Sequence, residues 1–203
     1  MWLEFFLTSF VVVISPGTGV IYTIGIGISR GVGASIAAAA GCTLGIVPHM
    51  TAAIFGLAAL LHASSVAFQV LKFAGVSYLL YMAWSTLRER GALEIASVHD
   101  PKPLGRVALT GGLINILNPK LSIFFLAFLP QFVPQDVTAP VAQMLVLSAI
   151  FMAMTFVVFV VYGAFASRLR QHVIESPSVL TWLRRGFAAA FVALSARLTF
   201  ASL

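Results

Sequence analysis

Charged residues are scarce in this chain. They make up 9% of its 203 residues, whereas soluble domains carry about 25%. So few charges cannot cover a surface that faces water, and 60% of the residues are hydrophobic. The composition therefore excludes an ordinary soluble domain and predicts that lipid surrounds most of the chain.

Cysteine and clustered acidic residues are nearly absent as well. The single cysteine, Cys42, can form neither an intramolecular disulfide nor a cysteine cage for a metal, so we expect a small packing residue. All the acidic residues except Glu4 lie in or beside the connections between apolar runs. The chain also lacks the phosphate-binding motif of ATP-hydrolysing proteins and the zinc motif HExxH. These absences argue against an enzyme, and they predict no metal and no cofactor.

Six apolar runs are long enough to cross a bilayer, which takes about 20 helical residues. They predict helices over residues 3–28, 34–61, 66–87, 107–132, 140–166 and 179–202. The runs are continuous and do not alternate with period two, which disfavours a barrel. The predicted fold class is all-α, a polytopic membrane protein with six transmembrane helices in a single domain over residues 1–203.

The six spans divide into two halves. Half one covers residues 1–87, a polar connection covers 88–106, and half two covers 107–203. Pro16 and Pro119 each interrupt the first span of a half. Because three spans is an odd number, a repeat of this kind must be inverted, and inverted repeats with broken helices are typical of transporters.

Lysine and arginine gather in the connections after the first, third and fifth spans, and none lies in the other connections. These residues are Arg30, Arg88, Arg90, Lys102, Arg106, Arg168 and Arg170, and Arg184 and Arg185 lie at the adjoining end of the sixth span. The positive-inside rule places their connections in the cytoplasm and both termini outside. The net charge of +6 then reflects orientation and not nucleic-acid binding, because no basic patch has interleaved aromatic residues.

The stretch Ser-Pro-Gly-Thr-Gly over residues 15–19 interrupts the first span. Proline removes a backbone donor and clashes with the preceding turn. Backbone groups freed inside lipid are costly, so such a break usually lines a wet cavity or a ligand site. A proline kink packed against neighbouring helices is the alternative. We take Ser15, Pro16, Gly17 and Thr18 as candidate substrate-binding residues.

The stretch Asn118-Pro119-Lys120 interrupts the fourth span, with Asn115 one turn earlier. Asparagine offers both donors and an acceptor to a zwitterion. A lysine inside a span costs about 2.5–3.5 kcal/mol and is a functional candidate by default. Alternatively, Lys120 snorkels or pairs with carbonyls at a helix C-terminus. We take Asn115, Asn118, Pro119 and Lys120 as further substrate-binding candidates.

These two breaks are expected to face each other near the middle of the membrane. Lys120 and the helix end in the first span would hold a carboxylate, because the N-terminal end of a helix carries positive partial charge. Asn118, Ser15 and backbone carbonyls would accept an ammonium group. The expected ligand is therefore a small zwitterion.

His49 and two glycines complete the set of notable residues in the second span. His49 is the proton-coupling candidate, because imidazole gains and loses a proton near neutral pH. A hydrogen bond between helices is the alternative role. Gly41 and Gly45 leave room for a close helix, and packing within the chain is favoured over a dimer face. A homodimer stays open.

The motifs also occur in a characteristic order along nearly the whole chain. They are Ser15-Pro16-Gly17, Ser29-Arg30-Gly31, Leu44-Gly45 with His49, Gly75 to Tyr81, Leu117 to Lys120, and Phe124 to Phe132. In this combination the sequence resembles the LysE/RhtB family of amino-acid exporters. The resemblance implies a protein of the bacterial inner membrane that exports amino acids or close derivatives. It implies energy from the proton-motive force, a small-molecule amino-acid substrate and the lipid bilayer as partners.

Three positions depart from the usual pattern of that family. Thr18 and Gly19 stand where members usually carry a second proline and an asparagine, and Ile46 stands where many carry an aspartate. These departures bear on the substrate and on proton coupling.

Two other classes of membrane protein are the alternatives to an exporter. A membrane electron carrier or a metal-ion transporter would need clustered metal ligands. A membrane-embedded enzyme would need a nucleophile, a base and a residue that orients them. The sequence offers neither set.

The predicted orientation can be tested directly. A reporter that is active only in the cytoplasm, fused after Leu203, is expected to be inactive, because the distribution of arginine and lysine places this end outside. The same reporter fused within residues 88–106 is the control and is expected to be active. An active fusion at the C-terminus would overturn the orientation.

Overall fold

The computed structural model describes residues 2–15, 17–61, 103–133 and 138–168, with single positions between 70 and 84 and between 185 and 196. All the regular elements among these residues are helices, as the composition predicts, and none is a strand. The predicted third and sixth spans, 66–87 and 179–202, lie almost entirely outside the described residues.

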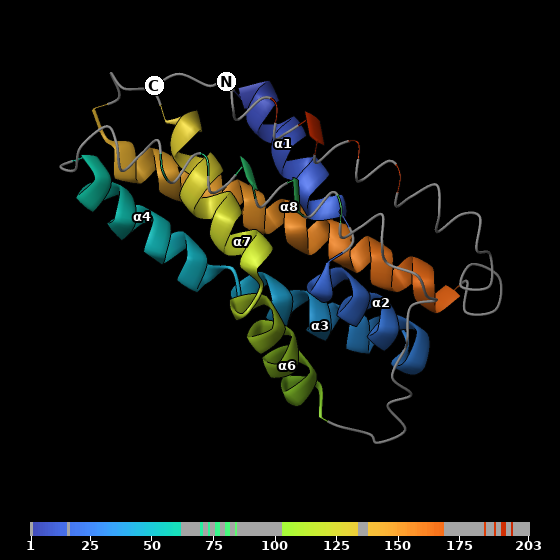
Figure 1. Ribbon diagram of the computed structural model, residues 1–203. Helices are drawn as coiled ribbons and strands as arrows, with labels where there is room; N and C mark the ends of the chain where they lie inside the picture. The colour runs from blue at the N-terminus through green and yellow to red at the C-terminus, as the bar shows by residue number, and fades with distance from the viewer. Residues whose placement is uncertain are drawn as a thin grey trace.

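The helices follow the predicted apolar runs. In chain order they are α1 (Trp2–Ile14), α2 (Thr18–Arg30), α3 (Val32–Leu44), α4 (Val47–Leu61), α6 (Leu104–Ile116), α7 (Pro119–Ile123) and α8 (Pro140–Arg168). A π-helical turn over Phe124–Phe128 and a 3-10 turn over Leu129–Phe132 follow α7. Figure 1 shows α8 running across the molecule, with α4 and α3 following one another along one side of it.

Bends occur at the two predicted breaks. The axes of α1 and α2 differ by 56°, and those of α6 and the segment Pro119–Phe132 differ by 53°. By length and apolar character, two helical stretches of the described residues could cross a membrane: Val32–Gly56, which takes in α3 and most of α4, and Pro140–Arg168, which is α8. The number rises to four when each bent pair counts as one span. The chain is therefore polytopic, and the prediction of six spans extends beyond the described residues.

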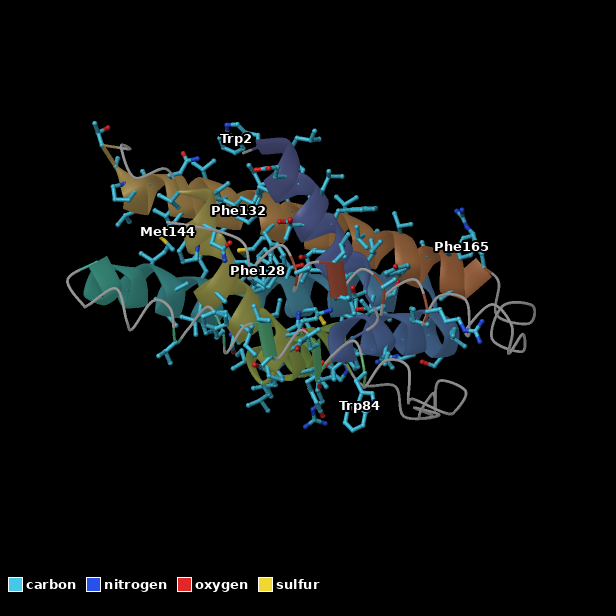
Figure 2. The ribbon with its side chains drawn as sticks, turned by 45° about the horizontal axis from the view of Figure 1, so that its top comes forward. Trp2, Trp84, Phe128, Phe132, Met144 and Phe165 are labelled. Atoms are coloured by element: carbon cyan, nitrogen blue, oxygen red, sulfur yellow. The ribbon has the colours of Figure 1, made fainter. Side chains whose placement is uncertain are left out.

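The buried side of α8 shows which face of a span meets the rest of the protein. Its buried residues recur every three or four positions, the spacing of one helix face. They are Met144, Leu147, Ser148, Phe151, Thr155, Phe159 and Gly163. The residues between them are largely apolar and many are exposed, as a lipid-facing surface requires. In Figure 2, Phe128 and Met144 lie among the helices, whereas Trp2 and Phe165 point away from them.

Pro130 accounts for the irregular helix after α7. Its nitrogen cannot donate to the carbonyl of Leu126, and its ring would crowd that carbonyl in a regular α-helix. The chain instead changes to a π-helical turn and then to a 3-10 turn. Phe124 and Phe125 are both buried there against Phe151 of α8, with ring centroids 4.5 and 5.3 Å away. This aromatic cluster joins the fourth span to the fifth.

Glycine lets the backbones of four helices come unusually close. A Cβ atom on Gly41 of α3 would fall on the carbonyl oxygen of Ala108 in α6. A Cβ on Gly27 of α2 would likewise fall on the carbonyl oxygen of Gly163 in α8. Gly41 is thus a packing position within the chain, which confirms the interpretation drawn from the sequence.

Replacing Gly41 with alanine is expected to destabilise the fold by about 1–3 kcal/mol, the usual cost of overpacking. The added methyl group meets backbone and not a flexible side chain, so α3 and α6 must move apart. Thermal unfolding of the purified protein in detergent measures the effect. Gly33→Ala on the same helix is the matched control, because a Cβ at Gly33 meets nothing within 4 Å. Equal unfolding temperatures for the two variants would contradict the packing argument.

Candidate functional site

Lys120 bridges the break in the first span. In a continuous helix the carbonyl of Val12 would accept a hydrogen bond from residue 16, but proline has no N–H. The Nζ atom of Lys120 supplies the missing donor, 3.1 Å from the Val12 oxygen and 3.1 Å from the Ser15 oxygen. Lys120 is only 8% exposed, so it does not snorkel. Its ammonium group is held at the C-terminal end of α1, where negative partial charge gathers.

The end of α1 is also fastened by α8. The hydroxyl of Tyr162 donates to the carbonyl of Ile14 at 2.9 Å. The last carbonyls of a helix have no partners within the helix, so side chains from distant segments take them here. The carbonyl end of α1 is therefore held from α7 and from α8.

His49 adds a further donor at the second break, where the Asn115 carbonyl also accepts from the Asn118 backbone N–H at 3.0 Å. Pro119 cannot donate to the carbonyl of Asn115, and the Nε2 atom of His49 lies 2.9 Å from that oxygen. Because a carbonyl only accepts, Nε2 carries the hydrogen. The Nδ1 atom lies 3.0 Å from the hydroxyl oxygen of Ser122. The imidazole is thus held on both sides, between α4 and the fourth span, and it is 7% exposed.

Two asparagines complete the polar network. Asn115 donates from Nδ2 to the carbonyl of Cys42 at 2.7 Å. Asn118 is the N-cap of α7, and its Oδ1 atom accepts from the Lys120 backbone N–H at 3.0 Å. The Asn118 Nδ2 atom lies 3.4 Å from Asn115 Oδ1, which is long for a hydrogen bond. The amide nitrogen of Asn118 is therefore the least committed donor of the pair.

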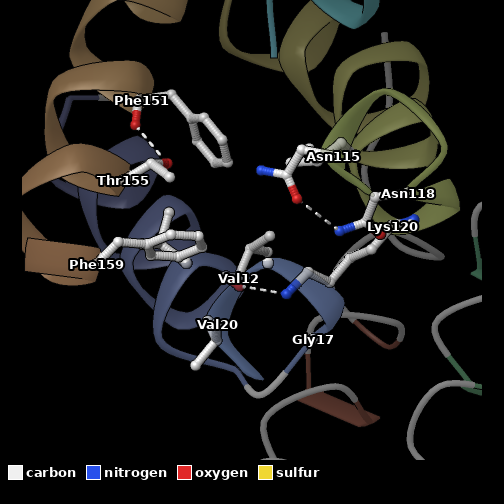
Figure 3. Close-up of a pocket in the computed structure, with 12 residues that line it drawn as sticks. Val12, Gly17, Val20, Asn115, Asn118, Lys120, Phe151, Thr155 and Phe159 are labelled. Carbon is white, nitrogen blue, oxygen red and sulfur yellow. Dashed lines mark hydrogen bonds between the residues drawn. The ribbon is translucent and has the colours of Figure 1, made fainter. Parts of the chain in front are cut away.

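A cavity lies where the two breaks meet (Figure 3). Its lining residues are Val12, Val13, Gly17, Gly19, Val20, Asn115, Asn118, Lys120, Leu121, Phe151, Thr155 and Phe159. One wall is polar, whereas valine, leucine and phenylalanine form much of the rest. The cavity volume is about 20 Å³, which is room for about one water molecule. In this conformation the cavity is therefore too small for an amino acid.

The N-terminal end of α2 also reaches the cavity, through Gly17, Gly19 and Val20. Gly17 is the N-cap and gives no side-chain cap. The first N–H groups of a helix lack partners within it, and they carry positive partial charge. Together with the Lys120 ammonium, this end gives the cavity a positive character.

Both glycines at the start of α2 make room for polar side chains from the fourth span. A Cβ atom on Gly17 would lie 3.0 Å from Lys120 Nζ. A Cβ on Gly19 would lie 2.6 Å from Asn115 Oδ1 and 3.0 Å from a ring carbon of Phe159. The space for a side chain at position 19 is thus already filled, which is a physical reason for glycine there.

The predicted candidates differ in where they lie relative to the cavity. Gly17, Asn115, Asn118 and Lys120 line the cavity, and Ser15 borders it through the carbonyl that accepts from Lys120. Thr18 and Pro119 are exposed and do not line it. His49 lies beside the cavity residue Asn115, and Pro16 lies outside the described residues.

The wall formed by α8 was not predicted from the sequence. Phe151, Thr155 and Phe159 are four residues apart and share one buried face. Their spacing shows that they belong together, but not that their face meets the proline breaks. The Thr155 hydroxyl donates to the Phe151 carbonyl at 2.9 Å, and its oxygen can still accept.

Acidic residues that could pair with Lys120 are scarce in the described part of the chain. Glu4 is the single acidic residue there, and it lies about two helical turns before Val12 on α1. The described residues contain no group of three or more His, Cys, Asp or Glu that could hold a metal ion. Among the described residues, the buried ammonium group donates to two backbone carbonyls, those of Val12 and Ser15.

Comparisons with known proteins agree on one family. The model of the LysE type translocator family matches residues 10–202. A homoserine/homoserine lactone efflux protein of Salmonella typhimurium is 31% identical, over 97% of this chain and 95% of that protein. A leucine efflux protein of Enterobacter sp. strain 638 is 28% identical, over 79% of this chain and 78% of that protein. No solved structure matches the chain.

Proposed function

Because the chain belongs to the LysE type translocator family, we propose that it exports an amino acid or a close derivative across the bacterial inner membrane. Membership makes the chain a transport protein and not an enzyme. The efflux proteins for homoserine or its lactone and for leucine support the substrate class. The observation that carries the proposal is the convergence of Lys120, Asn118 and the N-terminal end of α2 on one cavity.

The cavity suits a zwitterion with an uncharged side chain. A carboxylate is attracted by the start of α2 and by the Lys120 N–H that is not bonded to α1. The ammonium group of the substrate would bond to the Asn118 side-chain oxygen, because the Val12 and Ser15 carbonyls already accept from Lys120. Phe151 and Phe159 offer an apolar wall to the side chain, and Thr155 can accept from a hydroxyl.

The size of the cavity supports transport by alternating access. Its volume of about 20 Å³ holds water but no amino acid, so the helices must separate to admit the substrate. We place the site at the interface of two inverted repeats of three helices each. The paired bends of 56° and 53° support this arrangement, because each lies in the first span of a half.

The proposed orientation keeps the basic connections in the cytoplasm and both termini outside. Arg30 and Arg168 at the ends of α2 and α8, and Arg106 near the start of α6, support it.

We propose the proton-motive force as the energy source, with His49 as the proton carrier. Its imidazole contacts both Asn115 and Ser122. Protonation at Nδ1 would turn that nitrogen from acceptor to donor and would force the Ser122 hydroxyl to reorient. Such a change beside the second break could couple a proton to movement of α7.

Lys120→Ala and Asn118→Ala are each expected to lower export about tenfold or more, the loss that a charged hydrogen bond of about 1.5–3 kcal/mol represents. Homoserine and leucine in the medium of overexpressing cells and of a deletion strain measure export. Immunoblots of membranes check that each variant is present. Gly33→Ala, which lies outside the cavity, is the control and should export normally. Unchanged export by both site variants would refute the proposed site.

His49→Gln separates proton coupling from structure. Glutamine can still donate to the Asn115 carbonyl but cannot carry a proton. In proteoliposomes we expect the variant to lose substrate movement driven by a pH gradient and to keep exchange of labelled for unlabelled substrate. His49→Leu, which cannot donate to the carbonyl, should lose both activities. Gradient-driven transport at the wild-type rate in His49→Gln would rule out His49 as the carrier.

A further inference from the structure

The carbonyl end of α1 has the character of a cation site. In transporters with discontinuous helices, unwound carbonyls and helix C-terminal ends commonly coordinate Na⁺. Here the carbonyl oxygens of Val12 and Ser15 converge on one nitrogen atom, Lys120 Nζ, at 3.1 Å each. We infer that this carbonyl pair is a cation site that the chain fills with its own Lys120 ammonium, so that transport needs no sodium ion at this break.

Several contacts place the ammonium group there. Asn118 caps the start of α7 by accepting from the Lys120 backbone N–H, which fixes the residue next to the break. Gly17 has no side chain to obstruct the ammonium group, because a Cβ would lie only 3.0 Å from Nζ. The lysine thus enters the gap between α1 and α2 from the fourth span.

The surroundings favour a monovalent cation in particular. Glu4 is the single acid of the described segments, and it is about two helical turns away along α1. Two neutral carbonyls and a helix C-terminus offer partial negative charge, which matches one positive charge. A divalent ion generally takes more oxygen ligands, including carboxylates.

Removing the lysine side chain would leave the cation site open. The carbonyls of Val12 and Ser15 would lose the hydrogen bonds that Lys120 Nζ donates to them. The adjoining cavity already has room for about one water molecule, at about 20 Å³. A small cation with a water ligand could therefore take the place of the ammonium group.

This inference deepens the proposed transport site and rests on the proposed function for its meaning in the transport cycle. The cation site itself rests on the contacts of Lys120. The test is therefore divided into a binding measurement, which needs no substrate, and an export measurement.

The binding measurement compares thermal unfolding of purified proteins in sodium chloride, methylammonium chloride and choline chloride at equal concentration. We expect sodium and methylammonium each to raise the unfolding temperature of Lys120→Ala above its value in choline. When the cation concentration is about four to five times its dissociation constant, the expected rise in unfolding temperature is about 2–4 °C. The wild-type chain should unfold at one temperature in all three salts.

Lys120→Met is the matched control, because methionine fills the space of the lysine stem without charge or donors. It should show the same unfolding temperature in the three salts. Equal temperatures for Lys120→Ala in sodium, methylammonium and choline would overturn the inference. So would a rise in sodium as large for Lys120→Met as for Lys120→Ala.

The export measurement keeps the test independent of whether the alanine variant folds. Wild-type export should be the same when sodium in the medium is replaced by choline, and a drop of tenfold would overturn the inference. No export by the wild-type chain in either medium would instead count against the proposed function. The unfolding measurements would then still decide whether the cation site exists.

Discussion

Lipid cannot offer hydrogen bonds, and this constraint underlies the described structure. A proline inside a span frees the carbonyl four residues earlier, and inside a bilayer that carbonyl must find a donor within the protein. Lys120 supplies the donor for Val12, and His49 supplies one for Asn115. Each broken span is thus completed by a side chain from another span. The polar residues that make the breaks tolerable are also those that give the region its chemistry.

The same contacts hold the spans together. Lys120 joins the fourth span to the first, Tyr162 joins the fifth to the first, and His49 joins the second to the fourth. Helices in lipid gain little from apolar burial against one another, so close packing and hydrogen bonds carry much of their association. The glycines that allow close backbone packing and the hydrogen bonds to the free carbonyls therefore both stabilise the association of the spans. Packing and polarity are concentrated in the same group of helices.

The positions of the spans and of their proline breaks could be predicted from the sequence, but the contacts between spans could not. The fifth span was predicted over 140–166 and is observed as Pro140–Arg168. A long apolar run in lipid must satisfy its own backbone hydrogen bonds, and a helix does so. Both proline breaks were also predicted, since proline acts locally. The turn at Gly45 and Ile46 within the second span was not predicted, nor was the π-helical turn after α7. Their causes combine local chemistry with packing against other spans.

The site residues also differ in whether local sequence or packing between helices reveals them. Lys120 and Asn118 were predicted because a polar group in a span is costly unless it has a use. Thr155 and Tyr162 escaped notice, because their importance depends on which face of α8 meets the end of α1. Thr18 and Pro119 adjoin the breaks in the chain but are exposed. The rotation of a helix about its axis decides such cases, and tertiary contacts set that rotation.

The tight fit of Asn115 against Gly19 has a consequence for how sequences of this kind can diverge. The two positions share one volume, because a Cβ at residue 19 would lie 2.6 Å from the Asn115 Oδ1 atom. A lineage that regains a side chain at residue 19 must therefore accept a smaller or displaced residue at 115. That replacement would release the Cys42 carbonyl from its donor. Substitutions at positions 19 and 115 are thus expected to be inherited together, even though almost a hundred residues separate the two positions.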